Sequence, residues 1–296
     1  MCLEEAITGI FGENQRIVSK RPIYGGDTNE AYRLSLSDGS VVFMKCNTLK
    51  KLPFFEAEAK GLEALHKTGT IGVPKMLGIG ADREQGISFL LMEYLEAAPR
   101  VSGYWEVFGR ELAELHRADC YEFAVAERNL PFGFEADNYI GASLQINTRK
   151  DSWVTFFREC RLLPQFKMAE VYFDSNMRRQ CTKLLDHLDA YLTEPAFPSL
   201  LHGDLWSGNS VCGPDGKAWI LDPAVYVGHY EAELAMTELF GGNPDAFYSA
   251  YHEVTPIDSG YRDRRDLYNL YHLLNHLNLF GGSYLGSVQR IMNRYI

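Results

Sequence analysis

The first third of the chain alternates between short apolar runs and turn residues. Residues 21–47 predict three strands, separated by a glycine turn and by a second turn at Asp38-Gly39. A helix is predicted over residues 54–69. Residues 87–95 predict a further strand, which is apolar throughout and therefore central in its sheet. This region predicts a small antiparallel sheet with one main helix.

Beyond residue 96 the apolar positions recur with helical spacing. Amphipathic helices are predicted over residues 104–119, 151–166, 175–192 and 266–280. We therefore expect a two-lobed α+β protein, with an N-terminal lobe over residues 1–95 and a larger, mainly helical lobe over residues 96–296. The cleft that two lobes form is the default place for a binding site.

Composition narrows the class of protein. With 296 residues, 46% of them hydrophobic, the chain can form two domains with a sizeable core. It has no apolar run long enough to span a membrane, and its acidic start predicts no signal peptide. The six cysteines are widely spaced and include no CxxC pair, which favours reduced thiols in a cytoplasmic protein over a zinc site or a disulfide framework.

The net charge of −10 argues against a nucleic-acid partner. It also opposes an anionic substrate such as ATP, unless a local lysine, Mg²⁺ and backbone N–H groups overcome it. A cationic amine substrate would be attracted by the same charge.

The stretch LLHGDLWSGN, residues 200–209, is too polar for a buried strand and too rich in glycine for a helix. His202, Asp204 and Asn209 have the H-x-D-x-x-x-x-N spacing of a kinase catalytic loop. In such a loop the aspartate accepts a hydroxyl proton and the asparagine holds Mg²⁺. Gly203 and Gly208 would let the loop bend. The alternative is that the aspartate and the asparagine only cap turns.

A second acidic residue follows at the end of a predicted strand. The stretch KAWILDPA places Asp222 eighteen residues after Asp204. Kinases have their second Mg²⁺-binding aspartate in this position. An isolated Asp-Pro pair, however, is also a common turn signal.

Two charged residues lie in otherwise apolar elements. Lys45 lies within the apolar stretch VVFMKC, and Glu58 is on the apolar stripe of the next helix, three residues after Phe55. An inward carboxylate is costly unless it is paired, so Lys45 is its natural partner and would bind the phosphates of ATP. The alternatives are a lysine that extends to solvent and Glu56 as the partner.

The remaining nucleotide contacts are predicted from backbone groups. Gly25 and Gly26 in the first turn would let N–H groups approach phosphates. Backbone groups of Glu93 and Leu95, with Met92 beside the ring, would bind adenine. Each signal is modest, but their order along the chain is that of a kinase.

The segments HGDLWSGN and DPAVYVGHYEAELAMTELFGG resemble the fructosamine kinase (ketosamine-3-kinase) family, which is related to aminoglycoside and choline kinases and has a protein-kinase-like fold. The similarity covers nearly the whole chain, and Trp206–Gly208 is its most specific part. It implies transfer of phosphate from ATP, with Mg²⁺, to the 3-hydroxyl of the sugar in ketosamines, the adducts of sugars with free or protein-bound amines. Phosphorylation makes these adducts unstable, which implies deglycation.

The resemblance also implies a role for each candidate residue. It makes Asp204 the base, Asn209 and Asp222 the Mg²⁺ ligands, Lys45 and Glu58 the phosphate-positioning pair, and Trp206 a neighbour of the sugar. By the same comparison, His202 braces the loop, and Glu231 and Glu233 support it from behind.

Three other functions are alternatives to this interpretation. A kinase for an aminoglycoside or choline would suit the acidic net charge equally well. A pseudokinase scaffold is disfavoured because Lys45, Asp204, Asn209 and Asp222 are all present. A protein kinase is disfavoured because no A-P-E triplet and no long activation segment follow Asp222. For Trp206 itself, packing beneath the loop as part of the core is the alternative to a sugar contact.

Overall fold

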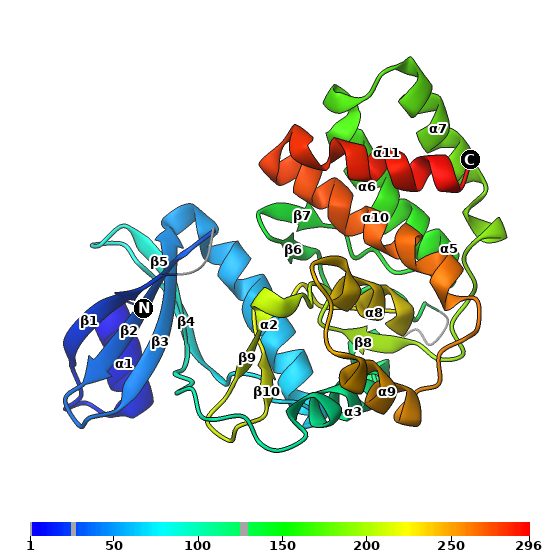
Figure 1. Cartoon of the computed structure of the whole chain (residues 1–296). Helices are drawn as coiled ribbons and strands as arrows, with labels where there is room; N and C mark the ends of the chain where they lie inside the picture. The colour runs from blue at the N-terminus through cyan, green and yellow to red at the C-terminus, as the bar shows by residue number, and fades with distance from the viewer. Residues whose placement is uncertain (1, 25–27, 125–129) are drawn as a thin grey trace. The chain divides into compact units, whose positions relative to one another are not determined.

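The computed structural model describes residues 2–24, 28–124 and 130–296 (Figure 1). The chain divides into two compact units. The first comprises Met1–Tyr104 and Val211–Asp222, and the second comprises Trp105–Ser210 and Pro223–Ile296. The assignment of nucleotide binding to residues 1–95 stays a prediction.

The first unit contains a five-stranded antiparallel sheet in the order β1-β2-β3-β5-β4. Its strands are β1 (Ile17–Ile23), β2 (Glu30–Leu36), β3 (Val41–Thr48), β4 (Met76–Asp82) and β5 (Ile87–Glu93). The three predicted N-terminal strands are confirmed, and so is the interior position of β5. At the predicted turn after β2, Gly39 has a φ of 90°, a conformation that glycine adopts without steric cost.

Two helices pack against this sheet (Figure 1). Helix α2 (Leu52–Thr68) follows the short 3₁₀ turn Leu49–Lys51 and buries the predicted stripe that includes Phe55, Leu62 and Leu65. Helix α1 (Leu3–Phe11), which the apolar pattern did not predict, buries its own short stripe in a core with residues of β2, β3 and β5.

The segment Val211–Asp222 folds with the first unit although it follows the catalytic loop. Strands β9 (Ser210–Cys212) and β10 (Ala218–Ile220) pair with each other, and Trp219 bridges to Gly72. A Cβ on Gly72 would lie 2.6 Å from the Trp219 ring, so only glycine allows this approach. The pairing brings Asp222, just beyond β10, to the unit that carries Lys45.

The second unit is mainly helical. Its helices are α3 (Tyr104–Arg117), α4 (Tyr121–Ala124), α5 (Trp153–Phe156), α6 (Leu163–Ala169), α7 (Ser175–Asp186), α8 (Tyr230–Leu239), α9 (Asp245–Val254), α10 (Tyr261–Phe280) and α11 (Leu285–Arg294). Short 3₁₀ segments cover Glu170–Tyr172, Leu188–Ala190, Ser207–Asn209 and Gly282–Tyr284. Helix α10 packs against α6, α8 and α11 and forms the centre of the unit (Figure 1).

The four helices predicted in this unit are present, but one is irregular. Between α5 and α6 the residues Phe157–Leu162 form a π-helical turn. Arg161 in this turn is fully buried and donates to the carbonyl of Ile146 and to the side chain of Asn147. An apolar pattern with a period of 3.6 residues does not reveal such a turn.

Short strands position the catalytic loop. Strand β8 (Ser199–Leu201) leads directly into the loop and pairs with β11 (Tyr226–Gly228). A further short hairpin joins β6 (Asn138–Ile140) and β7 (Ser143–Gln145). All six cysteines are free thiols, as predicted. Among the described residues, no helix is both long and apolar enough to cross a membrane.

Candidate active site

In the first unit, the structure brings Lys45, Glu58 and Asp222 together. The Nζ atom of Lys45, on β3, lies 2.6 Å from Oε1 of Glu58, on α2. The same Nζ also donates to Oδ1 of Asp222. The Lys45 and Glu58 side chains are almost fully buried, whereas 52% of the Asp222 side chain is exposed. The predicted pair is therefore formed, and Asp222 presents a carboxylate to solvent.

The charges in this cluster depend on one another. Burial by itself lowers the pKa of Lys45, but the carboxylates of Asp222 and Glu58 outweigh it and hold that pKa above its ordinary value. Burial raises the pKa of Glu58, against the opposing effect of Lys45. Lys45 thus remains a cation in a dry position, as a phosphate-binding lysine must.

The backbone of Asp222 adopts a left-handed conformation that is unusual for a residue other than glycine. Its φ of 57° is the only positive φ of a non-glycine residue in the part of the chain that the structure describes. Pro223 follows directly and restricts the preceding residue further. Such strain costs about 1–3 kcal/mol and concentrates at functional sites. A plain Asp-Pro turn would not require this conformation.

The predicted adenine contacts lie at the end of β5. Met92 is buried within the strand, and Glu93 is its last residue. The backbone N–H of Glu93 donates to the carbonyl of Lys75, and Oε1 of Glu93 accepts the N–H of Lys75. Leu95 follows in a segment without regular structure. The predicted phosphate contacts Gly25 and Gly26 lie outside the described residues.

In the second unit, Gly203 allows the catalytic loop to turn sharply after β8. Its φ is 85°, and a Cβ there would lie 2.1 Å from the carbonyl oxygen of Ala224. The loop is joined to the same segment by a 2.8 Å hydrogen bond from Ala224 N to His202 O. Both the backbone angle and the close approach therefore require glycine at this position.

A buried carboxylate supports the loop. Oε2 and Oε1 of Glu233, on α8, accept the N–H groups of His202 and Gly203 at 3.0 and 2.6 Å. Oε2 also lies 2.9 Å from Nε2 of His116, whose Nδ1 is 2.7 Å from the Tyr251 hydroxyl. Burial raises the pKa of Glu233, but these hydrogen bonds and the nearby histidines outweigh it and leave that pKa below its usual value. The implied support by Glu233 is thus formed.

Within the loop, hydrogen bonds orient Asp204. Its N–H donates to Nδ1 of His202 at 3.3 Å, which is the bracing expected of that histidine. The amide nitrogen of Asn209 donates to the Asp204 carbonyl at 2.8 Å and to Oδ2 at 3.3 Å. Only 18% of the Asp204 side chain is exposed. The backbone of Asp204 is therefore held by both neighbours, and its carboxylate, which Asn209 contacts, is still accessible.

Trp206 extends from the loop instead of packing under it. It is 40% exposed and makes an edge-to-face contact with Phe240. A Cβ on Gly208 would lie 2.3 Å from the Trp206 ring, so the ring rests on the backbone of the loop itself. The exposure disfavours the core alternative for this indole.

The atoms that the predicted magnesium ligands leave available decide whether they suit the ion. Because the amide nitrogen of Asn209 is used by Asp204, its side-chain oxygen is the atom left for a ligand. Asp222 contributes a half-exposed carboxylate. Both are hard oxygen donors of the kind that Mg²⁺ prefers, so the residues fit the ion.

Glu231 has a different partner from Glu233. Both its carboxylate oxygens accept from the Arg264 guanidinium, at 2.8 and 2.6 Å, and its implied support of the loop stays a prediction. Arg264 also pairs with Asp258. Alternate residues at the start of α8 therefore have different tasks, since Glu233 faces the loop and Glu231 faces α10.

Sequence reasoning also missed His272. Its Nδ1 lies 4.0 Å from Oδ1 of Asp204, is buried, and has no hydrogen-bond partner. Burial lowers the pKa of His272 to about 3, so the ring is neutral at pH 7. Little in the sequence signals it, because Asn269, Asn275 and His276, three or four positions away on the same helix face, are polar too.

Comparison with known proteins identifies the family of the chain. A family model for fructosamine kinase matches residues 2–296. A Synechocystis protein provisionally named ketoamine kinase is 40% identical over 300 residues, which cover 99% of this chain and 95% of that protein. The chloroplastic protein-ribulosamine 3-kinase of Arabidopsis thaliana is 39% identical, over 96% of this chain and 85% of its own length.

A solved structure shares the fold over its full length. The Haemophilus somnus protein provisionally named fructosamine-3-kinase superimposes with a TM-score of 0.86 at 30% identity, covering 100% of this chain and 97% of that one. Phosphotransferases of lower identity have the same fold, so the predicted two-lobed, protein-kinase-like α+β class is confirmed. The catalytic-loop residues, the lysine–glutamate pair and the match over the whole chain lead to one assignment: this chain belongs to the fructosamine kinase family.

Proposed function

We propose that this protein transfers a phosphoryl group from ATP, with Mg²⁺, to the 3-hydroxyl of the sugar in ketosamines. Its membership of the fructosamine kinase family and the name of the Arabidopsis relative support the acceptor. The observation that carries the proposal is the position of Asp204. His202 and Asn209 hold the backbone of Asp204, and Asn209 also donates to its carboxylate. This carboxylate is partly accessible and belongs to the loop that carries the exposed Trp206.

The acceptor side works through positioning. Asp204 orients the 3-hydroxyl and takes its proton as the hydroxyl oxygen bonds to phosphorus and ADP leaves. Trp206 forms a wall for the sugar, because an indole offers a large rigid surface at low entropic cost. Glu233 keeps the loop in place through its backbone N–H groups.

The nucleotide side works through charge. Lys45, held by Glu58, neutralises the phosphates, and Asn209 and Asp222 hold Mg²⁺, which supplies further neutralisation of the transferring group. Gly25 and Gly26 contact the phosphates through backbone N–H groups, and Met92, Glu93 and Leu95 contact the adenine. In this proposal residues 1–95 bind the nucleotide and residues 96–296 bind the acceptor.

The product of this reaction is a ketosamine 3-phosphate, which decomposes and frees the amine. The protein would therefore act in deglycation, in the cytoplasm, on small or protein-bound ketosamines. The net charge of −10 favours a cationic amine as acceptor. The proposal includes no nucleic-acid or membrane partner.

A phosphorylation assay with a panel of acceptors tests the proposal. The panel contains a fructosamine, a ribulosamine, an aminoglycoside and choline, each with ATP and with or without Mg²⁺. We expect phosphate transfer to a ketosamine only, and only with the metal present. Transfer to kanamycin or choline without transfer to either ketosamine would show that the acceptor is wrong.

A further inference from the structure

A connected series of aromatic rings begins at the catalytic loop and continues onto α10. Trp206 contacts Phe240, with ring centroids 6.3 Å apart, and Phe240 contacts His276 at 4.8 Å. His276 in turn contacts Phe280 at 5.4 Å and Tyr284 at 5.1 Å. The rings come from the loop, the end of α8, α10 and the segment after it, so the tertiary fold is what joins them.

The series starts at the reactive carboxylate. His272, His276 and Phe280 are spaced by four residues and therefore lie along one face of α10. The first of them has its Nδ1 4.0 Å from Oδ1 of Asp204. The helix face therefore leads away from Asp204, and each turn adds a ring.

These rings remain accessible. Phe280 is 53% exposed, and Phe240, His276 and Tyr284 are each partly exposed. Accessible aromatic rings that contact one another beside a reactive group can form a binding surface. His276 is held by a 2.9 Å contact between its Nδ1 and the carbonyl of His272, and burial lowers its pKa. It is therefore a neutral aromatic ring at pH 7.

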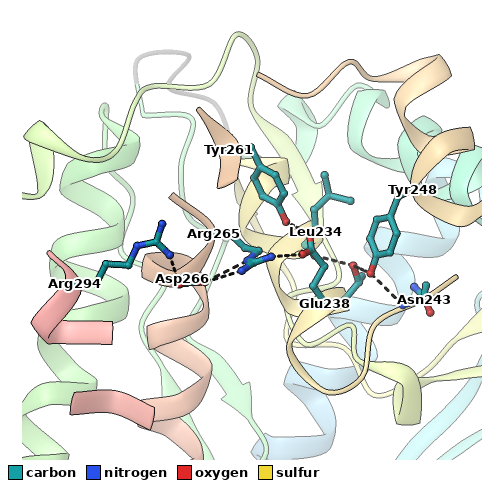
Figure 2. Close-up of polar contacts among 9 residues, drawn as sticks. Leu234, Glu238, Asn243, Tyr248, Tyr261, Arg265, Asp266 and Arg294 are labelled. Carbon is teal, nitrogen blue, oxygen red and sulfur yellow. Dashed lines mark hydrogen bonds and ion pairs between the residues drawn. The ribbon is translucent and has the colours of Figure 1, made fainter. Parts of the chain in front are cut away.

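Figure 2 shows polar contacts of Glu238 and Asn243, which lie before and after Phe240 in the chain at the end of α8. Glu238 accepts from the Tyr261 hydroxyl and, at 2.9 Å, from the Arg265 guanidinium. Beyond Phe240, the N–H of Asn243 donates to the Tyr248 hydroxyl at 3.1 Å. The ring is thus carried by a turn that is anchored on both sides.

The chemistry of a ketosamine explains what such a surface would bind. The amine is attached to C1 and the reacting hydroxyl to C3, so four bonds separate the nitrogen from the 3-hydroxyl oxygen. With bonds of about 1.5 Å, these two atoms are at most about 5 Å apart. When the 3-hydroxyl lies at Asp204, the amine and its substituent must therefore leave the site close to Trp206.

We propose that Phe240, His276, Phe280 and Tyr284 form a platform for the amine-bearing arm of the substrate, and that this arm is the alkyl side chain of a glycated lysine. The proposal rests on the proposed function, because it places the 3-hydroxyl at Asp204. The protonated secondary amine is attracted to aromatic faces, and the methylene chain packs along them. The platform would select long alkyl ketosamines over short ones.

Two adducts with the same sugar test the platform. Fructosyl-methylamine lacks the arm, and Nα-acetyl-Nε-fructosyl-lysine carries it. The measured quantity is the ratio of kcat/KM for the long adduct to kcat/KM for the short one. We expect Phe280→Ala to lower this ratio about tenfold, mainly through KM for the long adduct, because aromatic contacts of this kind contribute up to about that factor. Phe240→Ala should lower it as well.

Two controls sharpen the result. Phe280→Leu keeps apolar surface without the ring and should lower the ratio less than Phe280→Ala does. Val171→Ala changes another highly exposed apolar residue, in a different segment, and should leave the ratio as in the wild type. Melting temperatures of all variants show whether each is folded.

Failure of the platform and failure of the proposed function give different results. If folded Phe280→Ala and Phe240→Ala proteins both keep the wild-type ratio, whether or not overall activity falls, the platform does not exist. If the wild-type protein phosphorylates neither adduct, the proposed function itself is wrong. This outcome is seen in the wild type alone and does not depend on the ratio of the variants.

Discussion

The two groups of functional residues are held in different ways. In the first unit, Lys45, Glu58 and Asp222 are held by charge, and one of the two carboxylates is half exposed. In the second unit, the backbone of the catalytic loop is held by Glu233, which is completely buried and accepts two N–H groups. The first group can exchange partners with an incoming ligand. The second has its partners already in place.

This difference matches the two tasks of a kinase. Binding a nucleotide requires charges that can be shared with phosphates and a metal ion, so a cation with two carboxylate partners is well suited. Orienting a neutral hydroxyl requires a fixed geometry, since a displacement of about 1 Å can cost roughly 10²-fold in rate. We therefore expect substitutions in the two groups to have separable effects on the two substrates.

The largest effect is expected for Asp204→Asn. Removing the group that accepts the hydroxyl proton should lower kcat by roughly 10²–10⁴-fold. Because Asp204 acts on the acceptor, ATP affinity measured by calorimetry should stay close to that of the wild type. Turnover within about threefold of the wild type would show that Asp204 is not the base.

The next largest effect is expected for Asp222→Ala. Charge-assisted contacts contribute about 1.5–3 kcal/mol, so ATP affinity in the presence of Mg²⁺ should fall roughly 10–100-fold. Lys45→Ala should weaken ATP binding with or without the metal. Asp38→Ala removes an exposed carboxylate from a turn of the same unit and serves as the control. A Mg²⁺ dependence that survives in Asp222→Ala would contradict the ligand assignment.

A smaller effect distinguishes two buried glutamates of α8. Glu233→Gln should lower kcat about tenfold, because loss of one charged acceptor loosens the loop by roughly 1.5 kcal/mol. Glu231→Gln weakens the pairing with Arg264 instead and should reduce the melting temperature with little change in kcat. Equal losses of kcat in both variants would argue that only general destabilisation is involved.

The last prediction concerns stability at mildly acidic pH and not activity. Burial lowers the pKa of both His229 and His272 to about 3, well below the value of an exposed histidine. Between pH 6.5 and pH 5 the unfolded chain binds these two protons and the folded protein does not. The free energy of unfolding should therefore fall with decreasing pH by about 1.4 kcal/mol per unit for each histidine.

Denaturant titrations at several pH values measure this slope. His272→Asn should reduce the slope by the contribution of one histidine, and His229→Asn should reduce it by the contribution of the other. An unchanged slope in both variants would mean that the two histidines do not titrate as their burial indicates.

Much of this site was predictable because its residues break local rules. Three such features can be recognised from the sequence alone. They are a lysine inside an apolar strand, a glutamate on an apolar helix stripe, and a polar loop with two glycines. For that reason Glu58 could be predicted as a partner of Lys45, whereas the contact of Lys45 with Asp222 was not predicted. The fold class and the main helices followed from the period of the apolar positions.

Other features depend on contacts between distant residues. Nothing local indicates that Trp219 pairs with Gly72 and so brings Asp222 into the first unit. Glu231 pairs with Arg264 because α8 packs on α10. The elements α1, β4, α8, α9 and α11 were not predicted either, although α11 is clearly amphipathic and buries Val288 and Met292 on one face.

A pair of crossed binding measurements tests the central claim most directly. ATP–Mg²⁺ and a 3-deoxy ketosamine, which binds but cannot be phosphorylated, are each titrated by calorimetry into Lys45→Ala and into Trp206→Ala. The account predicts that Lys45→Ala loses ATP binding and keeps the ketosamine, whereas Trp206→Ala keeps ATP binding and loses the ketosamine. If each variant loses both ligands alike while remaining folded, the two groups of residues do not serve separate substrates and the account is contradicted.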